Sequence, residues 1–374
     1  MTDQYADLIR IAKRENNQKR SYLVVNRLQG KHLPVKPAQA LEMFGRLADG
    51  LQGICAAGKT LVIGFAETAT AIGAAVAMKT GACYIQTTRE EIAGATYLYF
   101  SEEHSHATQQ RLVKEDLDRI LPQTDCVIFA EDEVTTGKTI QNLIHVLQQE
   151  YAMPITYVAA SVINGMNPEA RNVYKDQGIE LRYLVKTEQT EDTMNLQKYV
   201  RKGSYRNLMQ KKEGAATVKN EAEVKELYAD GCLNARRLVT ADAYAAACDH
   251  LWHEIDGWLH RQFSGRILVL GTEEFMYPAL YVARQIEKSG AQVFFHATTR
   301  SPIEVYEEAD YPFHVRYELP SLYDKNRRTF LYDIDRYDLV LIVTDACGSD
   351  TEGLDALAQA VAYNNHKIYI VRWC

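Results

Sequence analysis

Short apolar runs alternate with amphipathic segments along most of the chain. In the first half the apolar runs predict strands at 60–65, 83–89, 126–131, 155–163 and 179–185. The segments around them predict helices at 36–57, 67–81, 138–150 and 168–177. Alternation of strand and helix is typical of a parallel α/β sheet, so this half is predicted to form one.

A second α/β unit is predicted in the last third of the chain. Tyr244, Leu251, Ile255 and Leu259 recur at helical spacing within a predicted helix at 241–263. Strands are predicted at 266–271, 291–300, 337–345 and 367–373, with a helix at 278–290. The predicted boundaries are a first domain at 1–200, a linker at 201–230 and a second α/β domain at 231–374.

The two halves resemble each other in sequence. "LVIGFAETATAIGAAVAMKTGACYIQTTRE" can be laid on "ILVLGTEEFMYPALYVARQIEKSGAQVFFHATTRS", which places Gly64 on Gly271 and Arg89 on Arg300. "DCVIFAED" then matches "DLVLIVTD" and places Asp132 on Asp345. Any two α/β segments share part of such a pattern, but the common "TTR" and the order of the blocks favour a degenerate copy of the first sheet.

Two polar stretches lack the periodicity of a core element. Residues 90–113 have no clear period, which in a compact domain indicates a functional lid or a disordered segment. Residues 186–230 are charged with little sign of a core, and are interpreted as the tail of the first domain plus a connector.

Composition narrows the class of protein. A chain of 374 residues with 47% hydrophobic and 24% charged residues is long enough for two domains. A net charge of −7 argues against a nucleic-acid or membrane-surface binder. The N-terminal segment lacks the apolar core of a signal peptide, and no apolar run approaches the ~20 residues of a membrane span. Seven scattered cysteines, without a C-x-x-C pair, are interpreted as reduced thiols of a cytoplasmic protein.

The most informative stretch is "DCVIFAEDEVTTGKTI", residues 125–140. It joins an apolar strand, the acids Glu131 and Asp132, a Thr-Thr-Gly turn and a helix. Backbone N–H groups of such a turn and of the helix N-terminus bind phosphate, and Gly137 allows close approach. The acids would repel phosphate but accept hydrogen bonds from the hydroxyls of a sugar. A ribose with a phosphate at one end satisfies both halves.

A Walker A loop is the obvious competitor because "GKT" is present. That motif needs a glycine five residues before Gly137, where this chain has Asp132, so a P-loop enzyme is disfavoured. A dinucleotide-binding fingerprint is also missing after the first predicted strand.

The stretch "VIFAEDEVTTGKT" resembles the phosphoribosyl-pyrophosphate (PRPP) signature of type I phosphoribosyltransferases. The resemblance implies that Glu131 and Asp132 hold the ribose hydroxyls. It also implies that a phosphate loop, consisting of Thr135, Thr136, Gly137, Lys138 and Thr139, holds the 5′-phosphate.

More narrowly, the chain resembles the phosphoribosyltransferase–TRSP proteins found with tellurium-resistance and stress-response gene clusters. The supporting strings are "KRSYLVVNRLQGKHLPV", "GFAETATAIG", "EEHSHAT", "EDEVTTGKT", "GTEEFMYPAL" and "TTRSPI". The implied fold is a parallel-sheet, Rossmann-like phosphoribosyltransferase domain followed by an α/β TRSP domain.

The resemblance implies further site residues in the first domain. Phe65, Ala66, Glu67 and Thr68 follow a predicted strand where these enzymes place a pyrophosphate loop, although Glu67 could simply favour the helix dipole. Arg89 could neutralise pyrophosphate or be an ordinary surface residue.

Residues 90–113 match the family's lid. Within it, His104 and His106 could contact the leaving group, act as an acid, or merely be solvated.

The N-terminal residues 19–35 resemble the family's hood. Tyr22 and His32 would then be base contacts, with a structural hairpin as the simpler interpretation. Thr135 stands where some members carry an aspartate base, which puts a purine-type base mechanism in doubt.

The function predicted from the sequence is transfer of 5-phosphoribosyl from PRPP to an unidentified base-like acceptor, with release of pyrophosphate. Mg²⁺ is the implied cofactor, carried by PRPP with Asp132 or Glu131 as protein ligand. The alternative is a PRPP- or nucleotide-sensing regulator without turnover. Neither nucleic acid nor membrane is an expected partner, and a homodimer is left open.

The second domain is predicted to lack this chemistry. "VTDACGSDTEG" replaces the phosphate loop, with Asp350 and Glu352 where a phosphate would lie. A second pocket for the acceptor or an effector is predicted from one set of polar residues: Glu273, Glu274, Thr299, Arg300 and Ser301. The alternative is that these residues only support the first domain.

Overall fold

The chain divides by its internal contacts into two units that interleave along the sequence. The computed structural model describes residues 8–16, 20–54, 58–101, 110–187, 196–209, 222–260, 263–349 and 351–374. Unit A comprises Leu41–Gln189 and Leu233–Ala247, and unit B comprises Met1–Ala40, Thr190–Cys232 and Cys248–Cys374. The boundaries predicted from the sequence stay a prediction, and each unit is described by itself.

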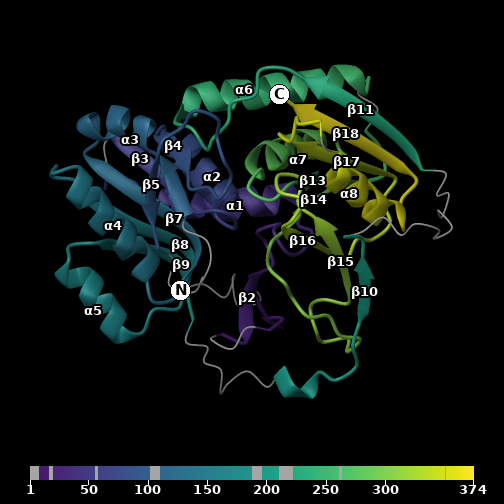
Figure 1. Ribbon diagram of the computed structural model, residues 1–374, viewed down its shortest axis with the longest axis horizontal. Coiled ribbons are helices and arrows are strands. Elements are labelled where there is room, and N and C mark those ends of the chain that lie inside the picture. The colour runs from purple at the N-terminus through teal and green to yellow at the C-terminus, as the bar shows by residue number, and fades with distance from the viewer. Residues whose placement is uncertain are drawn as a thin grey trace. The chain divides into compact units, whose positions relative to one another are not determined.

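Unit A contains a six-stranded sheet (Figure 1). Its strands are β3 (Thr60–Gly64), β4 (Cys83–Gln86), β7 (Cys126–Val134), β8 (Thr156–Asn164), β9 (Glu180–Lys186) and β12 (Val239–Thr240). The order is β12-β4-β3-β7-β8-β9, with β12 antiparallel to β4 and the other neighbours parallel. The predicted parallel α/β sheet is therefore confirmed.

Five helices accompany this sheet. Among the described residues they are the part of α1 (Pro37–Asp49) from Leu41 onward, α2 (Thr70–Thr80), α3 (Lys114–Ile120), α4 (Lys138–Glu150) and α5 (Pro168–Asp176), with a 3-10 turn at Leu121–Gln123. The Ala-rich helix α2 is buried along most of its length, and Gly81 ends it in the left-handed conformation with φ of 69°. The predicted helix at 36–57 is too long, because the chain turns after Asp49.

The prediction that residues 90–113 are structureless is wrong for the described part of that stretch. β5 (Tyr97–Phe100) and β6 (Gln110–Val113) pair antiparallel there. Strands of four residues carry too few alternations to stand out in a sequence pattern.

Residues 233–247 join unit A through a buried carboxylate. Asp116 of α3 accepts hydrogen bonds from Arg237 Nε at 2.6 Å and from the backbone N–H of Leu238 at 3.0 Å. The backbone N–H of Gln86 donates to the carbonyl of Ala235 at 2.9 Å. These contacts hold β12 beside β4.

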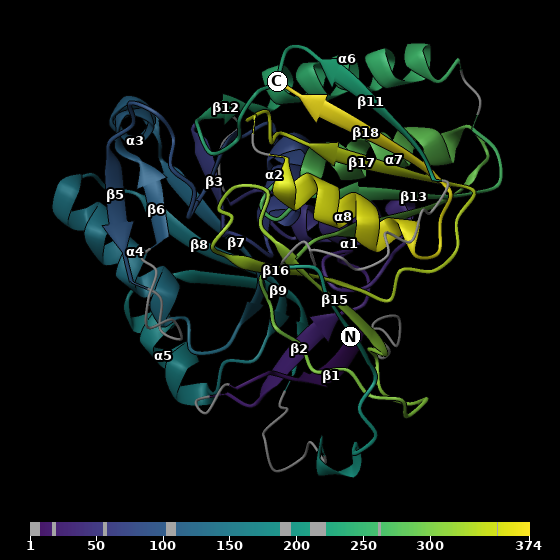
Figure 2. The same cartoon turned by 45° about the vertical axis from the view of Figure 1, so that its right-hand side comes forward.

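Unit B contains a five-stranded parallel sheet in the order β11-β18-β17-β13-β14. Its strands are β11 (Glu223–Ala229), β13 (Arg266–Gly271), β14 (Gln292–Ala297), β17 (Leu339–Thr344) and β18 (Lys367–Trp373). Its helices are α7 (Tyr277–Lys288), α8 (Glu352–Ala362) and the part of α6 (Ala241–Trp258) from Cys248 onward. Figure 2 shows α8 on one face of this sheet and α7 on the other.

Smaller sheets complete unit B. β1 (Ile9–Lys13) and β2 (Tyr22–Asn26) form a hairpin, and β10 (Ser204–Asn207), β15 (Val315–Pro320) and β16 (Arg328–Tyr332) form a three-stranded sheet. A 3-10 turn lies at Leu196–Lys198. The stretch 186–230, interpreted as a tail and a connector, therefore contains two strands that enter sheets, β10 and β11. Most residues of these two strands are exposed and polar, which hides the strand pattern.

Within the ranges that the structure describes, no helix has the length and apolarity needed to span a bilayer.

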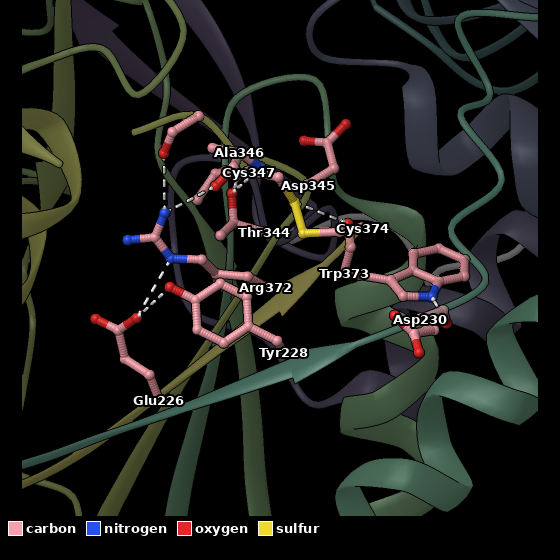
Figure 3. Close-up of a disulfide and its surroundings, with 12 residues drawn as sticks. Glu226, Tyr228, Asp230, Thr344, Asp345, Ala346, Cys347, Arg372, Trp373 and Cys374 are labelled. Carbon is pink, nitrogen blue, oxygen red and sulfur yellow. Dashed lines mark hydrogen bonds and ion pairs between the residues drawn. A yellow bond between two sulfur atoms is a disulfide. The ribbon is translucent and has the colours of Figure 1, made fainter. Parts of the chain in front are cut away.

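The interpretation of all seven cysteines as reduced thiols is also wrong. Cys347, in the segment after β17, forms a disulfide with Cys374, which follows β18 (Figure 3). Their Cα atoms lie 6.0 Å apart, within the usual range for a disulfide. Cys126 is disulfide-bonded as well, whereas Cys83, Cys232 and Cys248 are free thiols.

The disulfide closes a separation of 27 residues, which should limit the freedom of the unfolded chain. We expect the double variant Cys347→Ser/Cys374→Ser to lose about 3 kcal/mol of unfolding free energy under oxidising conditions. Denaturant titration with and without reductant measures this, and reductant should abolish the difference from wild type. Cys83→Ser, which changes a free thiol, is the matched control. An equal midpoint for wild type and double variant without reductant would show that the bond contributes nothing.

Candidate functional site

The acidic residues of the opening motif lie inside a strand rather than after it. β7 runs through Glu131, Asp132 and Glu133 to Val134, three residues beyond the predicted end. Successive side chains of a strand leave opposite faces of the sheet. Glu131 and Asp132 therefore meet different neighbours, and the sequence alone did not indicate this separation.

Asp132 is joined to the loop that follows β3. Its Oδ1 accepts a hydrogen bond from Thr68 Oγ1 at 3.0 Å and one from the backbone N–H of Glu133 at 2.9 Å. Both side chains belong to the predicted site, from positions 64 residues apart. The contact places the proposed ribose acid beside the proposed pyrophosphate loop.

Glu131 lies near Tyr174 of α5. Burial raises the pKa of Tyr174, and the negative charge of Glu131 raises it further. The Tyr174 hydroxyl donates to the carbonyl of Gly137 at 2.7 Å. A tyrosine far along the chain thus supports the phosphate loop, and no motif in the sequence pointed to it.

The phosphate loop joins β7 to α4. Gly137 is the residue before α4 and is left-handed, with φ of 77°, so it needs the freedom of glycine. The backbone N–H of Lys138 donates to Thr136 Oγ1 at 3.3 Å. Thr135 and Thr139 are half-buried on either side. Their hydroxyls and the N-terminal amides of α4 form a donor set suited to an anion.

Backbone hydrogen bonds hold the predicted pyrophosphate loop in place. Phe65 donates its backbone N–H to the carbonyl of Ala130 at 3.2 Å, and Ala66 donates to Thr87 Oγ1 at 2.8 Å. Glu67 is 9% exposed, and the peptide bond between Ala66 and Glu67 is cis. Thr68 carries the bond to Asp132.

The stem of the predicted lid reaches this loop. Gln110, at the start of β6, is 3% exposed and donates through Nε2 to the carbonyl of Ala66 at 2.9 Å. Its Oε1 accepts a hydrogen bond from Thr87. Gln110 therefore links the start of β6 to the loop through two hydrogen bonds. Gln110 lay within the predicted lid, but its sequence context gave no sign of this role.

The remaining predicted residues of unit A are less defined. Arg89 follows β4, is half-buried, and accepts a hydrogen bond at its carbonyl from Arg111 Nη2 at 3.0 Å. His104 and His106 lie outside the described residues.

The predicted second-pocket residues come together in unit B. Arg300 donates from Nε to Glu273 Oε2 at 2.8 Å and from Nη2 to Glu274 Oε1 at 3.2 Å. The backbone N–H of Ser301 donates to Thr299 Oγ1 at 3.2 Å. Both glutamates are almost fully buried.

The predicted base contacts of the N-terminal segment belong to unit B. Tyr22 begins β2 of the hairpin, and His32 lies in the following loop with 1% exposure. This agrees with the simpler hairpin interpretation, and the hood role stays a prediction.

Over the described residues, no group of three or more His, Cys, Asp or Glu side chains is arranged to hold a metal ion. A divalent cation at this edge would need oxygen ligands from its substrate as well.

Comparison with known proteins divides the chain in two. A family model described as "Phosphoribosyl transferase" matches residues 8–190. A second, described as "TRSP domain C terminus to PRTase_2", matches residues 239–361. Of the curated proteins compared with the chain, none matches it.

Solved structures match over about half of the chain. The APRTase of Giardia lamblia complexed with 9-deazaadenine is 14% identical with a TM-score of 0.37, over 49% of this chain and 96% of its own. Adenine phosphoribosyltransferase of Rhodothermus marinus is 11% identical with a TM-score of 0.35, over 50% and 97%. Orotate phosphoribosyltransferase of Mycobacterium tuberculosis, in complex with inorganic phosphate, is 18% identical with a TM-score of 0.27, over 44% and 78%.

The phosphate loop should depend on Gly137 for two separate reasons. A residue with a side chain there would be held in the disfavoured left-handed conformation, at a cost of about 1 kcal/mol. Its Cβ would also overlap the ring and hydroxyl of Tyr174. We expect Gly137→Ala to lower the unfolding free energy by clearly more than Gly178→Ala does. Gly178 has a similar φ of 69° but nothing within 4 Å of its Cβ position. Denaturant unfolding of both variants measures the difference, and equal losses would exclude the contact with Tyr174.

Proposed function

Because the chain belongs to the family in which a phosphoribosyltransferase domain is followed by a TRSP domain, we propose that it transfers the 5-phosphoribosyl group of PRPP to a nitrogenous, base-like acceptor. The observation that carries the proposal is the contact between Thr68 and Asp132 at 3.0 Å. This contact brings the loop after β3 next to Asp132, an acid suited to sugar hydroxyls. Asp132 lies on β7, the strand that leads into the anion-binding turn.

Each part of PRPP has a counterpart at this edge. The carboxylates of Asp132 and Glu131 would accept hydrogen bonds from the ribose hydroxyls. The phosphate loop, residues 135–139, would hold the 5′-phosphate on backbone amides and threonine hydroxyls. Phe65–Thr68 would face the diphosphate, with Arg89 as a source of positive charge.

Magnesium fits this arrangement as a companion of the substrate. Mg²⁺ prefers oxygen ligands and usually binds one or two carboxylates together with substrate phosphates. Asp132 and Glu131 supply carboxylates, and the described residues offer no complete protein cage. When bound, the ion would neutralise charge that develops on the leaving diphosphate.

The reaction itself is a displacement at C1′. The lone pair of the acceptor nitrogen forms a bond to C1′ as the bond from C1′ to the diphosphate oxygen breaks, and pyrophosphate leaves with that electron pair. The contribution of the protein is positioning and electrostatic stabilisation. Thr135 offers no carboxylate base, so the proton of the acceptor nitrogen would pass to solvent or to the departing pyrophosphate.

A phosphorylated sugar is too highly charged to cross a bilayer unaided. The proposal therefore places the protein in the cytoplasm with its substrate.

The acids of β7 should control PRPP affinity. We expect Asp132→Ala to weaken Mg-PRPP binding by about tenfold to a hundredfold, the value of one or two hydrogen bonds to a charged group. Glu131→Ala should cost less because Asp132 is the acid that Thr68 joins to the loop, whereas the charge of Glu131 acts on Tyr174; the double variant should cost most. Calorimetric titration of the folded variants measures this.

Asp125→Ala is the matched control for these variants. Asp125 lies just before β7, at the amino end of the strand, whereas the candidate site lies at its carboxyl end. It forms an exposed ion pair with Lys59. Unchanged affinity in a folded Glu131→Ala/Asp132→Ala double variant would overturn the proposed site.

The segment 90–113 should close over the substrate. Because Gln110 ties the start of β6 to Ala66, occupation of the loop should slow amide exchange across this segment. Hydrogen exchange with and without Mg-PRPP measures the effect, with the buried strand β8 as an internal reference. Equal and strong protection in both states would make the segment a fixed structural element.

A further inference from the structure

Four strands of the unit B sheet have the same order and connectivity as four strands of the unit A sheet. The order is β4-β3-β7-β8 in unit A and β14-β13-β17-β18 in unit B. From β3 and from β13 the chain runs through a helix to a neighbouring strand on one side, β4 or β14, and the next strand of the sheet, β7 or β17, lies on the other side. The fifth strand differs, because β9 follows β8 along the chain whereas β11 precedes β13.

Strand register supports the residue-by-residue match between the two halves. In unit A, Leu61 pairs with Cys83 on one side and Val127 on the other. In unit B, Leu268 pairs with Phe294 and Val340. These are the partners that the alignment of Gly64 with Gly271, Arg89 with Arg300 and Asp132 with Asp345 requires. Asp345 therefore occupies the place of Asp132.

Hydrogen bonds at the strand ends also match. Ala66 donates its backbone N–H to Thr87 Oγ1 at 2.8 Å, and the corresponding Glu273 donates to Thr298 Oγ1 at 3.0 Å. The backbone N–H of Thr88 donates to the carbonyl of Arg111 in β6, and that of Thr299 donates to the carbonyl of Phe330 in β16, both at 2.9 Å. Arg89 and Arg300 thus start from the same position in the two frames.

The phosphate-binding parts of this frame are altered in unit B. The turn before α8 lacks the Thr-Thr-Gly-Lys-Thr run, and the first turn of α8 carries Glu352 and Asp355. Asp350 lies outside the described residues. Carboxylates at this helix end disfavour a second anion by direct repulsion.

The place that corresponds to the pyrophosphate loop is filled by the chain's own carboxylates. Glu273 accepts from Arg300 at 2.8 Å, from Arg327 at 3.0 Å and from Ser321 at 2.5 Å, and Glu274 accepts from Arg300 at 3.2 Å. The two glutamates are at most 1% exposed. A diphosphate would have to displace buried, ion-paired carboxylates to reach Arg300.

Unit B keeps the carboxylate that corresponds to Asp132, the residue that would accept sugar hydroxyls in unit A. Asp345 is half-buried, and its Oδ1 accepts from the Tyr323 hydroxyl at 2.5 Å. That hydroxyl and Thr344 Oγ1 each lie 2.8 Å from Thr272 Oγ1, so the carboxyl ends of β13 and β17 are linked. Figure 3 shows Asp345 and Thr344 next to the Cys347–Cys374 disulfide.

Asp345 and Thr272 lie at the point of the unit B sheet where the direction of the strand connections reverses. The connections from β13 to β14 and from β17 to β18 run in opposite directions across the sheet. In open parallel sheets, ligands bind outside the carboxyl ends of the strands at this reversal point. Thr272, Glu273, Thr298 and Thr344 are all fully buried there and hydrogen-bonded to one another or to neighbouring groups.

We propose that this edge of unit B binds an unphosphorylated ribosyl compound of the nucleoside class, with its ribose hydroxyls on Asp345 and Tyr323. The carboxylate that accepts sugar hydroxyls is kept, whereas the two phosphate-binding regions are replaced or neutralised. The inference rests on the proposed function in one respect, the role of Asp132 as a ribose acceptor.

The test uses the full chain carrying Asp132→Ala, so that binding at the unit A site is weakened. Adenosine, guanosine, cytidine and uridine are titrated in turn by calorimetry, each beside its 5′-monophosphate. At least one nucleoside should bind with a stoichiometry of one, and its monophosphate should bind about tenfold more weakly or worse. Adding Asp345→Asn should weaken nucleoside binding by about tenfold, and Tyr323→Phe should weaken it less.

Asp335→Asn is the matched control, because Asp335 is an exposed acid that pairs with Arg266 at the amino end of β13, away from the carboxyl ends of the strands. It should leave nucleoside binding unchanged. Circular dichroism and thermal unfolding establish that Asp345→Asn is folded, and Tyr323→Phe provides an independent variant if it is not.

The inference is overturned if no nucleoside binds at millimolar concentration, if monophosphates bind equally well, or if neither variant weakens binding. Titration of wild type with Mg-PRPP separates this from the proposed function. PRPP binding without nucleoside binding contradicts the inference alone. Nucleoside binding without PRPP binding contradicts the proposed function alone.

Discussion

The parallel register of β3 and β7 is the constraint on which the candidate site depends. Because the two strands run in the same direction as neighbours, their carboxyl ends meet at one edge, and Thr68 comes within 3.0 Å of Asp132. Close packing at that edge leaves no room for side chains on two glycines. A Cβ on Gly64 would lie 2.6 Å from the Tyr84 hydroxyl, and one on Gly73 would lie 2.8 Å from the Cα of Gly64. The position of α2 against β3, and hence of the loop between them, follows from these two residues.

Elements with a strong apolar pattern could be predicted from the sequence. α4 and β13 have the predicted bounds. Exposed edge strands such as β11 could not be predicted, because pairing with β18 stabilises them rather than an apolar face of their own. The disulfide between Cys347 and Cys374 depends on two strand ends meeting in space, which spacing along the chain does not reveal.

The candidate site was predictable to a similar depth. The motif of residues 125–140 located the acids and the anion-binding turn because both are local in sequence. Residues that support the site from a distance were missed: Tyr174 under Gly137 and Gln110 under Ala66. A lone tyrosine or glutamine carries no sequence signal, since its role comes from tertiary packing. That Glu131 and Asp132 have different neighbours could not be predicted either, because it depends on the extension of β7 to Val134.

The two sheets share a frame but differ in the charges at their carboxyl edges. In unit A the edge combines carboxylates with the donors of a helix N-terminus, which suits a phosphorylated sugar. In unit B the corresponding arginine is neutralised by Glu273 and Glu274. Buried ion pairs of this kind add little net stability, because their desolvation offsets most of their attraction. In the nucleoside site that we propose for unit B, these carboxylates would disfavour a phosphorylated ligand.

Phosphoribosyl transfer is tested most directly by measuring pyrophosphate release from Mg-PRPP by the purified full chain. A small-molecule extract of cells provides the unidentified acceptor, and mass spectrometry detects ribosylated products. The account predicts that the extract stimulates pyrophosphate release, with one phosphoribosylated product formed for each pyrophosphate. Tight binding of Mg-PRPP without any acceptor-dependent release would contradict it and indicate a sensor of PRPP.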